Sequence, residues 1–443
     1  MKNIRVALVS LGCAKNLVDS EIMLALLQTE GFILVTEPAA ADAIIVNTCG
    51  FIDTAKEESI EKILEMARFK QASCRVLLAA GCLAQRFGTE LLAEIPELDG
   101  IFGTNDVHGA AEAIRRGFVG ERPALLQGEY QPPADAARLL ATPSHTAYLK
   151  IADGCDNHCT YCAIPAIRGP YRSKERQAIV AEAKKLAAGG VKEVNLIAQD
   201  ITLYGLDISG QLALPALLEE LSEISELHWI RLLYAYPERL NKQLVEAVAR
   251  LDKVCNYLDL PLQHGSDRIL RRMGRKTTAK RNIILLNSLR EEIPGITLRS
   301  SFIVGFPGEE EADFQALLDF LREAKLERVG FFAYSQEEGT PAARFRNQVP
   351  NELKEERVAR ALSLQSKIGI EKQKLLIGQK LKVMIDGRSA EDNSLLLARS
   401  AMQAPEVDGY VRLRDDDAKN GDFLQVEITG FDGYDLVGKN LNR

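Results

Sequence analysis

The segment of this chain best suited to chemistry is a short loop with three cysteines. Residues 154–162 read Gly-Cys-Asp-Asn-His-Cys-Thr-Tyr-Cys, which places Cys155, Cys159 and Cys162 (the loop triad) in CxxxCxxC spacing after a predicted strand. Three thiolates this close can bind three irons of a 4Fe–4S cluster and leave the fourth iron open to a small chelating ligand. The alternative is a zinc site that includes His158. Structural zinc usually takes two separated ligand pairs, and no second pair follows at zinc spacing.

A second group of cysteines is dispersed along the first 100 residues. Cys13, Cys49 and Cys82 (the dispersed triad) each follow a short apolar stretch and each lie beside a glycine. Because the ends of successive parallel strands converge on one edge of a sheet, we expect these thiols to meet and form a second metal site. Cys74 precedes its strand and Cys255 lies outside this region, so neither is expected to join them. The alternative is that all three are ordinary small buried hydrophobic residues.

The segments around the dispersed triad read as alternating strands and helices. These are predicted over 4–11, 18–29, 43–46, 53–70 and 75–80. Such alternation predicts an α/β domain with a parallel sheet and covering helices over residues 1–140. The stretch from Gln127 to Ser144 contains three prolines with little periodicity and is interpreted as a linker.

Beyond this linker, six more apolar stretches alternate with helical ones. Strands are predicted over 148–151, 193–198, 229–234, 257–260, 297–304 and 328–333. Six such units predict an open, partial α/β barrel of the TIM type over residues 141–374, with a long helical extension from residue 351. Short strands then alternate with turns and predict a small all-β barrel over residues 375–443. They are expected over 380–385, 394–400, 409–413 and 422–429.

The composition agrees with a multidomain α/β protein of the cytoplasm. The chain has 443 residues, and 46% of them are apolar. Its net charge of −7 means that the protein as a whole lacks the positive charge that attracts nucleic acid. No window approaches the roughly 18 uninterrupted apolar residues of a membrane-spanning helix, and the apolar run after Arg5 is shorter than a signal-peptide core. Eight cysteines are too sparse here for a disulfide scaffold and indicate metal or redox chemistry in a reducing compartment.

At the CxxxCxxC loop the sequence resembles the radical S-adenosylmethionine (SAM) enzymes. With the dispersed triad before it and a small β barrel after it, essentially the whole chain resembles the methylthiotransferases among them. The resemblance implies two 4Fe–4S clusters, one on each triad, and a TRAM domain as the terminal barrel. It implies that one SAM gives a radical and another the methyl group, while the second cluster presents or supplies sulfur. An electron donor such as flavodoxin or ferredoxin would then be required.

Three features favour the branch of that family that acts on a ribosomal protein. Residues 9–21 and the Gln199-Asp200 pair resemble this branch, although it commonly has proline in place of Ala14. The terminal region carries nine Lys and Arg against 12 Asp and Glu, and this net charge of −3 suits a basic protein better than nucleic acid. The resemblance then implies methylthiolation of the β-carbon of an aspartate in small-subunit ribosomal protein twelve. The alternatives are a tRNA adenosine methylthiotransferase and a non-catalytic metal-binding or ribosome-associated protein.

Five further residues are expected at the SAM site. The resemblance places Tyr161 beside the adenine, Gln263 in a segment that lines the cofactor site, and Ser301 where a strand leads into a glycine-rich turn near the adenosine. Arg271 belongs to a basic run that would contact the SAM carboxylate or the protein substrate. Gln199 ends a barrel strand at the carboxyl face, where barrel enzymes carry their chemistry. The alternatives are loop packing, a tight turn without a ligand and, for Arg271, a solvated helix face.

Overall fold

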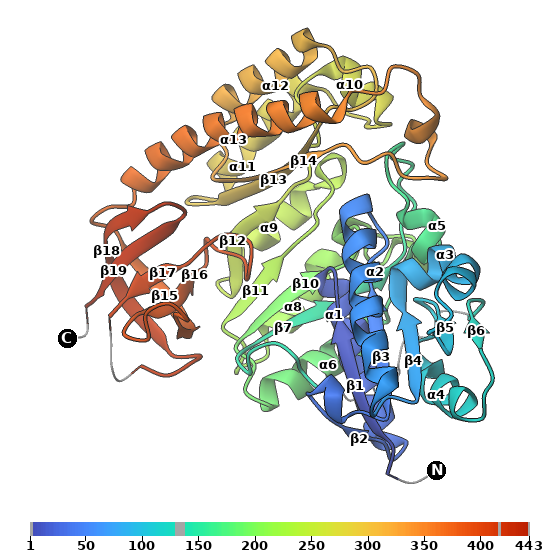
Figure 1. Cartoon of the computed structure of the whole chain (residues 1–443). Coiled ribbons are helices and arrows are strands. Elements are labelled where there is room, and N and C mark those ends of the chain that lie inside the picture. Colours follow the sequence, from blue (N-terminus) through green and yellow to red (C-terminus); the bar gives the residue numbers. More distant parts are fainter. Residues whose placement is uncertain (1–2, 129–137, 415–417, 442–443) are drawn as a thin grey trace. The chain divides into compact units, whose positions relative to one another are not determined.

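The computed structural model describes residues 3–128, 138–414 and 418–441. Apart from the undescribed residues, contacts divide the chain into two compact units (Figure 1). The first comprises Met1–Ala141, Ala152–Glu182 and Ser335–Ala343, and the second comprises Thr142–Ile151, Ala183–Tyr334 and Arg344–Arg443. The loop triad therefore belongs to the same unit as the dispersed triad.

The first unit is built on a six-stranded parallel sheet with the order β2-β1-β3-β4-β5-β6. The strands are β1 (Arg5–Ser10), β2 (Ile33–Leu34), β3 (Ala43–Thr48), β4 (Val76–Ala80), β5 (Gly100–Phe102) and β6 (Ala124–Leu125). Every residue of β3 and β4 is buried, as expected for continuous apolar strands at the centre of a parallel sheet. This confirms the predicted parallel-sheet domain.

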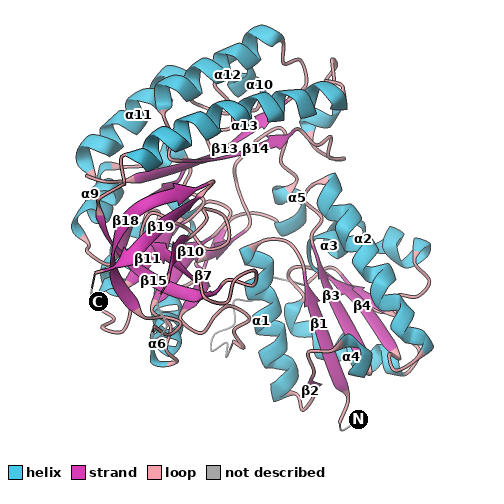
Figure 2. Ribbon diagram, turned by 60° about the vertical axis from the view of Figure 1, so that its left-hand side comes forward, coloured by secondary structure: helices cyan, strands magenta, loops and turns pink. Residues whose placement is uncertain are grey.

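Helices cover both faces of this sheet (Figure 2). They are α1 (Ala14–Thr29), α2 (Asp53–Ala67), α3 (Gly81–Glu94) and α4 (Ala110–Phe118), with 3-10 turns at Pro38–Ala40, Arg68–Gln71 and Val107–Gly109. Leu27 of α1 and Ile114 of α4 pack in one apolar core, whereas Ile63 of α2 and Leu83 of α3 pack in another. The two cores hold the ends of β1, β3 and β4 in fixed positions, which matters because the cysteines follow these ends.

Two later segments complete the first unit. β8 (Ala152–Asp153) pairs antiparallel with β9 (Arg172–Ser173), and the loop triad lies between β8 and the short helix α5 (Ile164–Arg168). α6 (Arg176–Ala188) begins in the first unit and ends in the second. Of the predicted linker, residues 129–137 lie outside the described residues.

The second unit contains six parallel strands in the order β14-β13-β12-β11-β10-β7. They are β7 (Thr146–Lys150), β10 (Glu193–Ile197), β11 (Trp229–Leu232), β12 (Val254–Asp259), β13 (Thr297–Val304) and β14 (Arg328–Ala333). β7 and β14 are at opposite edges and do not pair with each other, so the predicted open barrel is confirmed. β12 begins three residues earlier than predicted because Val254 and Cys255 are also buried in the sheet.

Helices alternate with these strands. They are α7 (Leu206–Ser209), α8 (Leu214–Ser222), α9 (Lys242–Arg250), α10 (Asp267–Arg272), α11 (Ala279–Glu292), α12 (Glu311–Ala324) and α13 (Asn351–Lys374), with 3-10 turns at Ile201–Leu203, Pro237–Arg239 and Pro341–Arg344. In the described ranges no single helix is long and apolar enough to span a membrane. Residues Ile201–Ser209 and α8 together have the length and apolar composition of such a helix, but the chain bends by 107° between them.

The terminal region is a closed barrel with the strand order β15-β16-β17-β19-β18. Its strands are β15 (Lys380–Arg388), β16 (Leu396–Ser400), β17 (Val411–Leu413), β18 (Phe423–Asp432) and β19 (Asp435–Asn440). Four were predicted. The fifth, β19, closes the barrel by pairing antiparallel with β18 and parallel with β17. Its sequence, Asp-Leu-Val-Gly-Lys-Asn, is short and interrupted by glycine, and therefore carries little strand signal.

A buried ion network joins this barrel to the parallel sheet of the same unit. Glu193, the first residue of β10, accepts hydrogen bonds from Arg231 of β11 and from Arg399 of β16, at 3.0 and 2.7 Å. Arg399 also pairs with Asp386 of β15. Because buried charges are tolerated only when they are paired, this network specifies where the barrel docks.

Candidate metal centre and cofactor site

The dispersed cysteines lie at the carboxyl ends of neighbouring parallel strands. Cys13 is the N-cap residue of α1 after β1, and Cys49 directly follows β3. Cys82 is the second residue of α3, immediately after β4. Because β1, β3 and β4 are adjacent in the sheet, the predicted convergence of the three loops on one edge is observed.

The glycines beside these cysteines let the three loops approach closely. A Cβ on Gly12 would lie 2.8 Å from Cβ of Cys49, and one on Gly50 would lie 2.7 Å from the backbone nitrogen of Leu83. Gly12 also has φ +88°, a conformation that favours glycine. Any larger residue at these two positions would push the cysteine loops apart.

The thiols of the dispersed triad influence one another electrostatically. Burial raises the pKa of the Cys82 thiol to about 11, Arg168 opposes that rise, and Cys13 and Cys49 add to it. Desolvation also acts on Cys13. There the charges of Lys15 and Arg168 and nearby backbone N–H groups prevail, and the pKa of the thiol lies below its usual value. The three thiols are thus close enough for the charge of one to affect the pKa of another.

The loop triad is held by its own backbone. The Cys155 N–H donates to the Gly169 carbonyl, and the Asn157 N–H donates to Sγ of Cys155 at 3.4 Å. Burial raises the pKa of the Cys162 thiol to about 12, and Cys159 and Cys155 add to the rise. These thiols are therefore also neighbours.

Gly154 is required for the fold of this loop. Its φ is +74°, and a Cβ would lie 2.0 Å from the carbonyl oxygen of Pro170. The β8–β9 pair that carries the loop can close only with glycine at this position.

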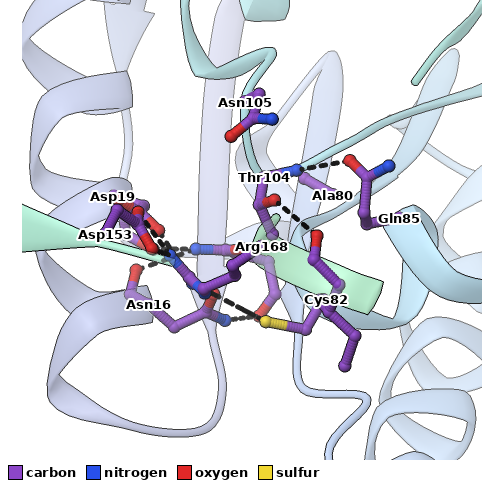
Figure 3. Close-up of polar contacts among 12 residues, drawn as sticks. Asn16, Asp19, Ala80, Cys82, Gln85, Thr104, Asn105, Asp153 and Arg168 are labelled. Atoms are coloured by element: carbon purple, nitrogen blue, oxygen red, sulfur yellow. Dashed lines mark hydrogen bonds and ion pairs between the residues drawn. The ribbon is translucent and has the colours of Figure 1, made fainter. Parts of the chain in front are cut away.

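Arg168, at the end of α5, links the two triads (Figure 3). Its guanidinium donates to Asp153, which precedes the loop triad, and to Asp19 of α1, at 2.9 and 3.0 Å. It also donates to Asn16 at 3.3 Å and to Sγ of Cys82 at 3.6 Å. A fork of donors with fixed geometry is suited to several acceptors at once. One buried side chain thus contacts both Cys82 of the dispersed triad and Asp153, the last residue before the loop of the other triad.

The donor sets fit iron–sulfur clusters. Each triad offers only sulfur ligands, and backbone or guanidinium N–H groups donate to one sulfur of each. Over residues 3–128, 138–414 and 418–441, no three His, Cys, Asp or Glu side chains are arranged to hold a single metal ion.

Among the five expected SAM-site residues, Gln199 has the most distinctive environment. It follows β10 by two residues, and both its amide nitrogen and oxygen are buried without a hydrogen-bond partner in the described part of the chain. Buried polar groups normally have partners, so an unpaired amide at the carboxyl edge of a barrel sheet indicates a ligand site. Its neighbour Asp200 is structural, because it accepts from Thr202 and pairs with Arg239.

Gln263 and Ser301 are brought together within the second unit. The Gln263 N–H donates to the Ser301 carbonyl at 3.0 Å, and Gln263 has φ +73°, which is strained for a residue with a side chain. Tyr161 is half-buried in the loop triad of the first unit, and Arg271 is exposed in the last turn of α10. The structure leaves the roles of these four residues as predictions.

Most of the basic run around Arg271 has structural partners. Arg268 pairs with Asp313, Arg275 pairs with Glu238, and Arg272 donates to the Pro307 carbonyl. His264 is fully buried, where Nδ1 accepts from the Ser266 N–H and Nε2 lies 3.3 Å from Glu309. These observations favour the structural interpretation of this segment.

Sequence reasoning missed the residues that hold the two triads. Arg168, Asp153, Asp19 and Asn16 were not singled out. The available signal was a lone arginine after the apolar run Ala-Ile-Pro-Ala-Ile and before glycine. A charge in such a place has to be buried with partners.

Comparisons with known proteins agree with this arrangement. Residues 5–103 match the uncharacterized protein family UPF0004, residues 149–321 the Radical SAM superfamily and residues 377–440 the TRAM domain. A relative from Desulforudis audaxviator is 50% identical over 446 residues, covering 99% of this chain and 97% of the relative. Another from Desulforamulus reducens is 48% identical, covering 98% and 99%. Both are named ribosomal protein uS12 methylthiotransferase RimO. The chain belongs to the RimO family.

Solved structures show the same fold at low sequence identity. The radical SAM methyltransferase TsrM from Kitasatospora setae, with cobalamin and a [4Fe–4S] cluster bound, has a TM-score of 0.58 and 16% identity, covering 86% of this RimO-family chain and 76% of its own. The cobalamin-dependent SAM radical enzyme OxsB has a TM-score of 0.53 and 14% identity, covering 82% and 56%. A radical SAM enzyme fold is therefore shown for this chain, with an iron–sulfur cluster and SAM as the cofactors of that superfamily.

Proposed function

We propose that this chain adds a methylthio group to the β-carbon of an aspartate in ribosomal protein uS12, the small-subunit protein twelve. The observation that carries the proposal is the presence of two separate cysteine triads in one compact unit, linked through Arg168. The names of the relatives, at 46–50% identity over nearly full length, support the substrate. The reaction would take place in the cytoplasm with an electron donor such as flavodoxin or ferredoxin.

Each triad has a proposed role. Cys155, Cys159 and Cys162 would hold the cluster that binds SAM, and the dispersed triad would hold a second 4Fe–4S cluster. When bound, these groups supply a methyl group, sulfur and a radical. The radical removes hydrogen from an inert C–H bond. The functional segments would be residues 1–140 for the second cluster, 141–374 for radical chemistry and 375–443 for the TRAM barrel.

The protein's own residues provide placement and exclusion of water. Cys82 and Cys155 are buried, so water has little access to one sulfur of each triad. The unpaired amide of Gln199 offers both a donor and an acceptor to SAM or to the substrate aspartate. We propose that Tyr161, Gln263, Ser301 and Arg271 each contribute to the binding of SAM.

The charge of the terminal barrel supports a basic protein as the partner. Arg399 is buried against Glu193, and Arg412 pairs with Asp435, so neither cation is available as a free surface charge. Arg412 also pairs with Asp432, and residues 375–443 together carry a net charge of −3. A barrel surface with this balance attracts a basic protein more strongly than a polyphosphate backbone.

A competition experiment tests the proposal. Enzyme reconstituted anaerobically with iron and sulfide would receive reductant, SAM, recombinant uS12 and unmodified tRNA together, and both products would be analysed by mass spectrometry. We expect a methylthio adduct on one aspartate peptide of uS12 and none in the Cys159→Ala control. A methylthio nucleoside in the tRNA digest, with uS12 unmodified, would assign the chain to tRNA instead. Protein that stays colourless after reconstitution would contradict the clusters.

A further inference from the structure

Arg168 is a buried cation to which the proposed reaction assigns no chemical step. Its side chain is 1% exposed and lies between two carboxylates, Asp19 and Asp153. The two buried carboxylates need a positive charge beside them, which explains an arginine at this position. They do not explain why its guanidinium also donates to a cysteine sulfur. The Nη2–Sγ distance to Cys82 is 3.6 Å.

The helix that carries Arg168 is fixed to the first sheet by other contacts. The Thr104 hydroxyl, just after β5, donates to the Ile167 carbonyl at 3.3 Å. Ala163 and Ile167 pack against Cys82 in a small apolar cluster. α5 begins directly after the loop triad, so these contacts also fix one end of that loop. Arg168 therefore reaches Cys82 from a rigid position.

An N–H donor at a cluster-bound sulfur changes the energetics of the cluster. Reduction adds negative charge to the cluster and its thiolates, and an N–H that points to a sulfur stabilises that charge. The effect is stronger in a buried environment, where water screens it less. Removal of the donor makes the reduced state less stable and moves the midpoint potential to a more negative value.

We infer that Arg168 is a positioning residue that links the two cysteine triads and raises the reduction potential of a cluster on the dispersed triad. This inference rests on the proposed function, because it needs a cluster at that triad. It goes beyond that function by assigning to one side chain both the spacing of the two cysteine loops and the electron affinity of the second site. A lysine cannot replace it, because an ammonium group lacks the planar fork that serves Asp153 and Cys82 together.

The test uses the full-length chain with the loop triad changed to alanine, so that only the dispersed triad can hold a cluster. In this background we would compare Arg168→Lys with the matched control Arg138→Lys. Arg138 is similarly buried in the same unit and also pairs with two carboxylates, Glu21 of α1 and Glu182. Iron and sulfide content, and the midpoint potential from a reductive titration followed by electron paramagnetic resonance, would be measured for each protein.

We expect Arg168→Lys to lower the midpoint potential with iron content retained, and Arg138→Lys to leave the potential at the parent value. Equal potentials in all three proteins, or equal shifts in both variants, would overturn the inference while leaving the second cluster in place. A parent that binds no iron at the dispersed triad would instead refute the second cluster, and the inference with it.

A second variant covers the case in which Arg168→Lys does not fold. Asp19→Asn keeps the shape of the side chain and its acceptor oxygen, and leaves Arg168 with one buried carboxylate fewer. The uncompensated positive charge next to Cys82 should then raise the midpoint potential, opposite in sign to the lysine variant. An unchanged or lowered potential would contradict the inference.

Discussion

Cys13 and Cys82 belong to one triad but differ in the acidity of their thiols. Cys13 is exposed, and its pKa is lowered although desolvation opposes this, because Lys15 and Arg168 contribute positive charge. Cys82 is buried, and its pKa is raised to about 11. Since the thiolate is the reactive form, the two residues should behave differently in metal-free protein.

The first prediction concerns this difference. In metal-free protein at neutral pH, iodoacetamide should modify Cys13 well before Cys82. At pH values below about 11, each increase of one pH unit should raise the thiolate fraction of Cys82 about tenfold. The alkylation rate of Cys13 should level off at a lower pH. Mass spectrometry of the alkylated peptides as a function of pH measures both rates. Equal rates at neutral pH would contradict the assigned environments.

The second prediction concerns Gly154. Gly154→Ala should prevent the loop triad from binding iron, because the new Cβ would collide with the Pro170 carbonyl. Gly210→Ala is the matched control. Gly210 has a similar φ of +70°, but a Cβ there would meet nothing within 4 Å. Iron analysis and the visible absorption spectrum compare the two, and equal loss in both would mean that backbone strain alone is responsible.

At the scale of elements, the strands that carry chemistry were predictable from sequence. β3 and β4 are largely apolar runs, and the structure places them, like β13 and β14, within a residue or two of the prediction. β19 was missed because its role depends on β17 and β18, which are its neighbours in space. Gly12 and Gly50 were recognised as signals, but only the structure shows that they permit contact between loops.

The third prediction concerns docking of the terminal barrel. Glu193→Gln should destabilise this contact by about 3 kcal/mol, because it leaves Arg231 and Arg399 buried with reduced charge compensation. Trp229, the chain's one tryptophan, meets the ring of Phe423 of the barrel edge-on at 5.0 Å and reports on this contact.

Urea denaturation followed by the fluorescence of this tryptophan measures the change. The control is Glu391→Gln, an exposed carboxylate in the turn between β15 and β16, which should alter stability by less than about 0.5 kcal/mol. An equal midpoint for Glu193→Gln and the parent would show that the buried ion network contributes nothing to docking.

The candidate site was predictable where spacing alone determines chemistry. Both triads could be proposed from cysteine positions, whereas Arg168 could not. The role of Arg168 depends on contacts with Asp19 and Cys82, which are 149 and 86 residues away in sequence. Gln199 was predicted from its position at a strand end, and the structure adds that its amide is buried and unpaired.

At the scale of the whole molecule, the fourth prediction separates the two triads by function. Cys159→Ala should abolish cleavage of SAM. Cys49→Ala should leave cleavage largely intact but abolish methylthio transfer to uS12, because only the sulfur-supplying site is lost. Cys74→Ala, a buried cysteine of the same unit outside both triads, is the control and should retain both activities. Transfer by Cys49→Ala at the parent level would refute the second site.

The division of the chain into units has a consequence for its synthesis. The first unit contains Ser335–Ala343, where Glu337 is buried in ion pairs with Lys56 of α2 and Arg86 of α3. Because a ribosome makes the chain from the N-terminus, the earliest sheet must wait until three quarters of the polypeptide has emerged before this segment can dock. Until then the cysteines of the dispersed triad lie in an incomplete unit, so we expect clusters to be installed only after this segment has been made.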